Sequence, residues 1–136
     1  MTLQDIEKSL PYGFENAIIW DIQIRYGKRD AEMHLSVVVG ENNQHSDYRL
    51  RILLTGLLYF VIEPQHPNYF DDYLEDGPGR VWVSNSEAHQ WAGAEGTSQG
   101  LKKLQLPDGA FTFRLLVHDW NAYIHIAAMS ATVERV

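Results

Sequence analysis

The chain contains no cysteine. This absence excludes disulfide bonds, zinc–thiolate sites and cysteine nucleophiles. Small secreted domains often depend on disulfides for stability, so a cysteine-free chain favours a reducing compartment. We therefore expect a cytoplasmic protein.

Long hydrophobic runs are also missing. The longest apolar stretch covers residues 52–62, is interrupted by Thr55 and Gly56, and is too short to cross a bilayer. Residues 1–10 carry Asp5 and Glu7 and lack the apolar centre of a signal peptide. We expect no membrane partner.

Positive charge is scarce. The chain has 11 Lys and Arg residues and 18 Asp and Glu residues, which gives a net charge of -7. Binding to nucleic acid needs Lys and Arg to neutralise phosphates, so the balance argues against a nucleic-acid partner. An acidic protein of this kind is suited to a protein partner of basic character.

Several motifs of catalysis and cofactor binding are absent. The Gly77-Pro78-Gly79 sequence lacks the Lys and Ser/Thr that follow in a phosphate-binding loop. There is no Gly-x-Ser-x-Gly nucleophile motif and no His-Glu-x-x-His zinc motif. We therefore expect no cofactor, and a non-enzymatic function is favoured.

The sequence does contain enough apolar residues to form a hydrophobic core. Hydrophobic residues make up 45% of 136 residues, which predicts a single domain over residues 1–136. Thr2 followed by Asp5 predicts a helix start, with Leu3 and Ile6 on one apolar face and Pro11 ending the helix.

From Asn16 onward the hydrophobic period is two, which predicts strands. Residues 16–26 and 31–39 form a hairpin, residues 48–54 a third strand and residues 81–83 a short one, while residues 111–117 and 124–128 form the last hairpin. The apolar run at residues 57–62 predicts a segment covered on both faces.

These strands predict a mostly β fold. The expected architecture is an antiparallel β-sandwich or a strongly curved sheet of about six to eight strands, built of hairpins, with one short N-terminal helix. The predicted core consists of Ile18, Trp20, Ile22, Ile24, Met33, Leu35, Val37, Leu50, Ile52, Leu54, Phe113, Leu115, Val117, Ile124 and Ile126.

The last hairpin also carries two histidines. A two-residue turn at residues 120–121 places His118 opposite Tyr123, with His125 on the same face and Asp119 beside the turn. Two histidines and a carboxylate can bind a metal such as zinc or act as a general base. The other interpretation, which is commoner for so small a set, is that these are half-exposed sheet residues.

A loop that is both acidic and aromatic follows residue 63. Its carboxylates do not have the spacing of a calcium-binding loop. Aromatic residues among acids are typical of protein-binding surfaces, although they can also pack a loop onto a sheet. The candidate binding residues are Tyr69, Phe70, Asp71, Asp72, Tyr73, Glu75 and Asp76.

Two stretches resemble known proteins. They are Tyr-Gly-Phe-Glu-Asn-Ala-Ile-Ile-Trp-Asp-Ile-Gln-Ile at residues 12–24 and Asp-Trp-Asn-Ala-Tyr-Ile-His-Ile-Ala-Ala at residues 119–128. Both resemble small bacterial β-rich domains of unknown function and, more distantly, the immunity proteins of polymorphic toxin systems. The resemblance implies a single-domain cytoplasmic protein that binds and blocks a toxin.

Three functions follow from the sequence. The first is a non-enzymatic, immunity-like protein-binding module that uses the acidic and aromatic loop. The second is a metal-dependent or histidine-using enzyme centred on His118 and His125. The third is a β domain that binds a small ligand between the sheet and the long loops.

Overall fold

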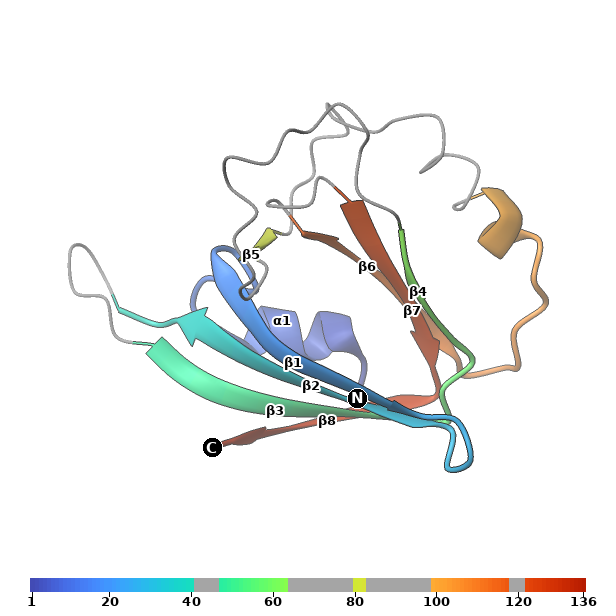
Figure 1. The fold of residues 1–136 in the computed structure, drawn as a ribbon, viewed down its shortest axis with the longest axis horizontal. Helices are drawn as coiled ribbons and strands as arrows, with labels where there is room; N and C mark the ends of the chain where they lie inside the picture. Colours follow the sequence, from blue (N-terminus) through green and yellow to red (C-terminus); the bar gives the residue numbers. More distant parts are fainter. Residues whose placement is uncertain (41–46, 64–79, 83–98, 118–121) are drawn as a thin grey trace.

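The computed structural model describes residues 1–40, 47–63, 80–82, 99–117 and 122–136, with residues 80–82 described for the backbone alone. Figure 1 shows the chain as a strongly bent layer of strands with a short helix beside it. The elements in chain order are α1 (Leu3–Ser9), β1 (Ala17–Arg25), β2 (Asp30–Val38), β3 (Asp47–Thr55), β4 (Tyr59–Ile62), β5 (Arg80–Trp82), β6 (Phe111–Val117), β7 (Ala122–Ala128) and β8 (Ser130–Arg135), with a helical turn at residues 99–102.

The strands form one hydrogen-bonded order, β4-β7-β6-β5-β1-β2-β3-β8, in which all neighbours are antiparallel. Strands β1, β2, β3 and β8 make a four-stranded half, and β6, β7 and β4 make a three-stranded half. The three-residue β5 joins the halves. The sheet is not closed into a barrel. The mostly β, antiparallel fold with one short N-terminal helix is as predicted and is confirmed.

The two halves meet at a corner where the chain crosses between them twice. It passes from β3 to β4 through Gly56, and from β7 to β8 through Met129. The Met129 backbone N–H donates to the carbonyls of Thr55 and Gly56, at 3.1 Å each. Strands of both halves converge there in Figure 1. The bend of the sheet is therefore held by backbone hydrogen bonds between the two crossings.

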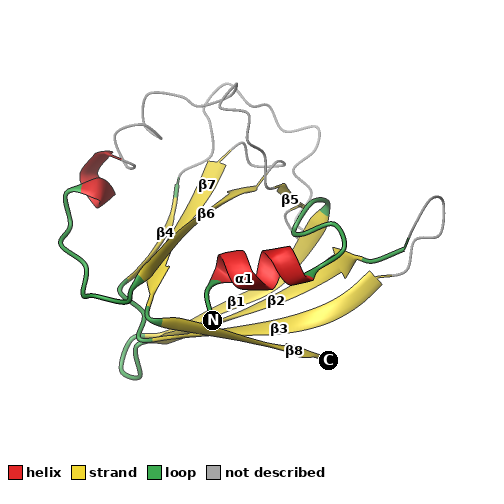
Figure 2. Cartoon of the chain, turned by 180° about the vertical axis from the view of Figure 1, so that it is seen from behind, coloured by secondary structure: helices red, strands yellow, loops and turns green. Residues whose placement is uncertain are grey.

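Helix α1 lies on the concave side of the sheet (Figure 2). It begins as predicted, because Thr2 and Asp5 form a capping box that satisfies free N–H groups of the first turn. Leu3 and Ile6 face the sheet and are fully buried. Burying a Leu or Ile side chain contributes about 1.5–3 kcal/mol, so these contacts hold so short a helix in place.

The core lies between α1 and the inner faces of both halves. It contains the predicted residues of β2, β3, β6 and β7, all nearly or fully buried, while Ile22 and Ile24 are partly buried against it. Phe14, just before β1, packs edge-on against Phe113 with ring centroids 5.9 Å apart. The predicted core face is therefore confirmed in these strands, although β7 is buried on both faces rather than on one.

Strand β1 departs from the prediction because of a β-bulge. Ile19 pairs with Leu35, but the next pair is Asp21 with His34, so Trp20 is the extra residue. Before the bulge it is Ala17 and Ile19 that face the core. The prediction that Ile18 and Trp20 are core residues is wrong, and Trp20 is 47% exposed.

Two other predictions need correction at the edges of the sheet. The apolar run at residues 57–62 is not covered on both faces, because β4 is an edge strand in which Ile62 is 47% exposed. Strand β8, which forms the other edge, was not predicted. No helix in the described ranges has the length and apolar character needed to cross a membrane.

Replacing Gly56 by Ala should strain the corner. Gly56 has φ of +61°, and an added Cβ would lie 2.7 Å from Cγ of Met129. A left-handed conformation costs a non-glycine residue about 1–2 kcal/mol, and the contact adds to this. We expect the free energy of unfolding to fall by about 2–3 kcal/mol in urea denaturation. Gly27→Ala is the control, since its Cβ would meet nothing within 4 Å, and equal stability of both variants would contradict the corner's role.

Glu7 should make stability depend on pH. Its Oε2 atom is buried without a hydrogen-bond partner, and burial raises the pKa of its carboxyl above the ordinary 4.5. The protonated form is thus favoured in the fold, so this contribution is present at low pH and is lost as pH rises through the folded pKa. We expect Glu7→Gln to be more stable than wild type at pH 7, by less than about 1 kcal/mol because the group is partly solvated.

In thermal melts the advantage of Glu7→Gln should disappear as the pH falls below 4.5. Glu15→Gln makes the same charge change at an exposed position and serves as the control. A Glu7→Gln protein that is less stable than wild type at pH 7, with the control unchanged, would show that the carboxylate is stabilising.

Candidate functional site

The acidic and aromatic loop lies outside the part of the chain that the structure describes, so its predicted binding role stays a prediction. The same holds for two of the three predicted metal ligands, His118 and Asp119. The third, His125, is described. The loop residues concerned are Tyr69, Phe70, Asp71, Asp72, Tyr73, Glu75 and Asp76.

Polar side chains cover the outer face of the four-stranded half, the face opposite α1. Arg25 bonds Asp30 at 2.6 Å and reaches Glu32 at 3.4 Å, and His34 lies 3.2 Å from Glu32. The hydrogen bond from His34 and the charge of Arg25 hold the pKa of Glu32 below its usual value. These residues largely neutralise one another, as on many solvated sheet faces.

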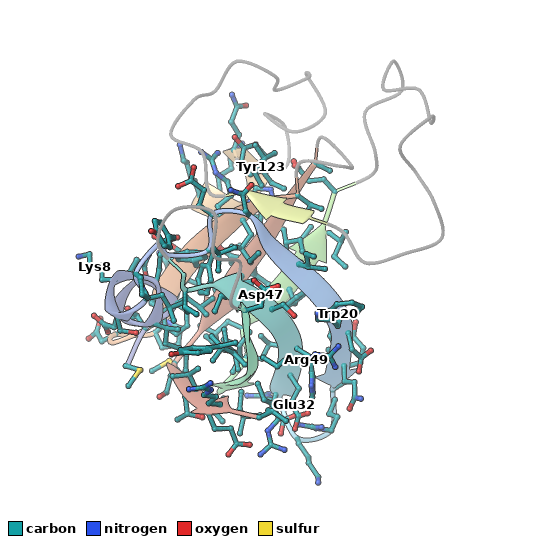
Figure 3. All side chains as sticks on the ribbon, turned by 90° about the vertical axis from the view of Figure 1, so that its left-hand side faces the viewer. Lys8, Trp20, Glu32, Asp47, Arg49 and Tyr123 are labelled. Carbon is teal, nitrogen blue, oxygen red and sulfur yellow. The ribbon has the colours of Figure 1, made fainter. Side chains whose placement is uncertain are left out.

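Trp20 stands apart from this network on the same face. The bulge turns its ring outward, and its indole Nε1–H donates to Oγ of Ser36 at 2.5 Å. The guanidinium of Arg49, on β3, lies 4.8 Å from the ring centroid. Figure 3 shows Trp20 and Arg49 close together, on the side of the sheet away from Lys8 of α1. The ring is therefore fixed in position while about half of it contacts solvent.

The arginines of this face differ in their partners. Arg25 is paired with carboxylates, and Arg51 with Glu134. Among the described residues, no carboxylate lies within ion-pair distance of Arg49, which contacts the Trp20 ring instead. The guanidinium has donors directed in several directions, so this pair offers an apolar surface beside a cation. We refer to Trp20, Ser36 and Arg49 as the Trp20 patch.

A second cluster lies on the outer face of the three-stranded half. Glu63, directly after β4, accepts a hydrogen bond from the Tyr123 N–H at 2.7 Å through Oε1. Its Oε2 lies 3.3 Å from Nε2 of His125, and the two side chains expose only 1% and 6% of their surface. The two facing atoms are buried, and although they lie within ion-pair distance, neither forms a hydrogen bond. The pair ties the end of β4 to β7.

The register of the last hairpin corrects the predicted arrangement around His125. Tyr123 pairs with Leu116 and His125 with Arg114, so His118 does not lie opposite Tyr123. The connection between the strands has four residues, 118–121, where a two-residue turn was expected. Arg114 shares the face of Tyr123, and its guanidinium lies 4.3 Å from that ring.

The described residues offer little for metal binding. Within those ranges, no three His, Asp or Glu residues are grouped so that they could hold a metal ion. Glu63 and His125 could supply two ligands at most. His34 cannot join them, because β2 is separated from β7 by β1, β5 and β6.

Neither Glu63 nor the Trp20 patch is predicted as a site from the sequence. Glu63 directly precedes the acidic and aromatic loop, and it is the first charge after the uncharged run at residues 57–62. Trp20 was assigned to the core because Ile18, Trp20 and Ile22 alternate. The adjacent pair Ile18-Ile19 was the available signal, since either residue could face the core and a change of face between them needs a bulge.

Comparison with protein-family models finds no match to this chain. Comparisons with curated proteins and with solved structures also find none. Both clusters are therefore interpreted from their own geometry.

Removing Glu63 should cost more stability than changing its charge. Glu63→Ala removes the acceptor of the Tyr123 N–H and the carboxylate beside the His125 imidazole, and losing the partner of a buried polar group costs about 1–3 kcal/mol. Glu63→Gln keeps an acceptor for Tyr123 and places an N–H donor facing His125, so we expect a loss of about 1 kcal/mol or less. Urea denaturation of the two variants measures the difference. Equal losses would mean that the hydrogen bonds of Glu63 do not stabilise the fold.

Proposed function

We propose that this protein is a non-enzymatic protein-binding module that contacts its partner through the Trp20 patch. The observation that supports this is a half-exposed tryptophan that a β-bulge turns away from the core. β-Bulges often serve to re-aim a side chain at a functional surface. A tryptophan with no binding role would be better placed in the core, where its large apolar surface stabilises the fold.

The surroundings of Trp20 are those of a binding hot spot. Tryptophan and arginine are the residues most enriched at hot spots, and a polar rim usually surrounds them. Here the ring is held by Ser36 and Arg49, and the charged network around Glu32 provides the rim. Because the ring is already fixed, binding loses little side-chain entropy at this position.

The partner we propose is a basic protein. The net charge of -7 attracts a basic surface at long range and increases the rate of association. At short range, Arg49 can bind a carboxylate or carbonyl of that partner. We propose that the acidic residues between Tyr69 and Asp76 also contact this basic partner.

An immunity-like role in the cytoplasm fits this proposal. It is supported by the resemblance of residues 12–24 and 119–128 to β-rich immunity proteins, and by the acidic, cysteine-free composition. Under this proposal the partner is a toxin domain that the protein blocks by occupying its surface.

The alternative of a histidine-using enzyme has one described feature in its favour, the carboxylate–imidazole pair of Glu63 and His125. A general base must come within hydrogen-bonding reach of its substrate. The facing atoms of this pair are buried away from solvent, and the carboxylate bonds the Tyr123 N–H through its other oxygen, which is the arrangement of a structural contact. Protein binding is therefore the better supported function.

Replacing Trp20 should weaken binding without unfolding the protein. We expect Trp20→Ala to weaken partner binding at least about tenfold, which corresponds to about 1.4 kcal/mol. The measurement is capture from a lysate of the source cells on immobilised protein at low salt, with quantitative mass spectrometry and then titration of the purified partner. Thermal melts check that the variant is folded.

Tyr26→Ala is the matched control, because Tyr26 is also aromatic, is 85% exposed and lies in the β1–β2 turn. It should bind the partner as wild type does. A basic partner should also be lost as salt rises, since salt screens charge attraction. Partners captured equally by wild type and Trp20→Ala would contradict the proposal.

A further inference from the structure

Strand β4 is an edge strand of unusual composition. It ends the sheet order and, within the described part of the chain, pairs with β7 alone. Its residues, Tyr59–Ile62, carry no charge, and neither do Leu57 and Leu58 before it. Ile62 is 47% and Leu58 36% exposed. Sheet edges are normally protected by charges, prolines or bulges because their open hydrogen-bonding groups recruit other strands.

The other edge of the sheet shows such protection. On β8 the Ala131 N–H donates to the Met1 carbonyl at 2.8 Å, so part of that edge is occupied by the chain itself. Glu134 and Arg135 add charge to the remainder and are held by Arg51 and by the ring of Tyr48. Strand β4 has neither kind of protection among the described residues.

The register with β7 shows which backbone groups of β4 are open. The Glu63 N–H donates to the Tyr123 carbonyl, and Val61 pairs with His125. Because backbone groups alternate in direction along a strand, the N–H and C=O groups of Phe60 and Ile62 point away from β7. No other described residue forms a backbone hydrogen bond with them.

We infer that β4 pairs antiparallel with β4 of a second copy of this chain, about a two-fold axis at Val61. In that register Phe60 and Ile62 of the second copy lie opposite Ile62 and Phe60, and each opposed pair exchanges both backbone hydrogen bonds. Val61 lies opposite its own copy. The open groups of one strand are thus satisfied by the same groups of the other, as a self-complementary two-fold interface requires.

The side chains fit this arrangement as well. Phe60 and Ile62 share one face of the strand, so each Phe60 lies opposite an Ile62, an aromatic–β-branched pair that stabilises sheets. No like charges meet across the strands, because β4 has none. A strand of another protein could form the same backbone hydrogen bonds, but the uncharged edge of β4 has no side chain that would favour one such protein over others. Self-complementarity therefore favours a second copy.

The association should be weak and should strengthen with salt. The interface is small, which implies a dissociation constant on the order of 10–100 µM. Each copy carries a charge of -7, so the copies repel at long range until salt screens the charge. This salt dependence is opposite to that proposed for a basic partner, and the dimer does not depend on the Trp20 patch.

Sedimentation equilibrium of the full chain, from about 1 to about 300 µM, tests the inference at low and high salt. We expect a monomer–dimer equilibrium that Ile62→Lys weakens at least about tenfold, because the variant places a charge on the exposed edge. Thr132→Lys makes the same charge change on an exposed residue of the other edge strand and should dimerise as wild type does. Circular dichroism melts establish that both variants are folded.

Hydrogen exchange of wild type makes the test independent of the variants. In the dimer the amides of Phe60 and Ile62 should be protected, and they should lose protection on dilution to about 1 µM. A monomer at about 300 µM would overturn the inference. Amide protection that persists on dilution would also overturn it, because it would mean that the same chain covers the edge. Protection that appears only when a second protein is added would overturn it as well. Equal dimerisation of Ile62→Lys and Thr132→Lys would place the interface elsewhere and overturn it too.

Discussion

The contact between Gly56 and Met129 determines the shape of the whole sheet. Both chain crossings between the halves pass this point, and the Met129 N–H bonds the carbonyls before and at the glycine. A side chain at position 56 would occupy the space of Met129. Because the crossings can approach so closely, the halves fold toward each other and leave room for α1 on the concave side (Figure 2). The core therefore depends on this corner.

Much of the fold could be predicted because several of its strands alternate cleanly. Strands β2 and β3 and the first part of β6 follow period two, whereas β7 is buried throughout, and the capping sequence at Thr2 marks the start of α1. The bulge at Trp20 could not be predicted, because Ile18-Ile19 permits either face to point inward and pairing with β2 decides between them. Strand β8 was missed because it is short and mostly polar outside Ala131 and Val133.

The candidate sites were predicted less well, for a related reason. A side chain's role here depends on strand register, which local sequence specifies weakly. A shift of two residues in the last hairpin moves the expected neighbour of Tyr123 from His118 to Leu116. Glu63 acquires its role only because β4 pairs with β7, far along the chain. The sequence thus points to His125, but the carboxylate that lies beside it, Glu63, could not be found from the sequence.

The pairing of β3 with β8 has a consequence for the order of folding. Strands β1, β2 and β3 follow one another and form contacts that are close in sequence, which favours rapid assembly. Strand β8 pairs with β3 across all of residues 56–129, and closing so long a segment is entropically slow. The outer edge of β3 must therefore stay open until the three-stranded half has formed. Completion of the four-stranded half is expected to be a late step, and until then β3 is paired on one side only, with β2, while its other backbone edge is open.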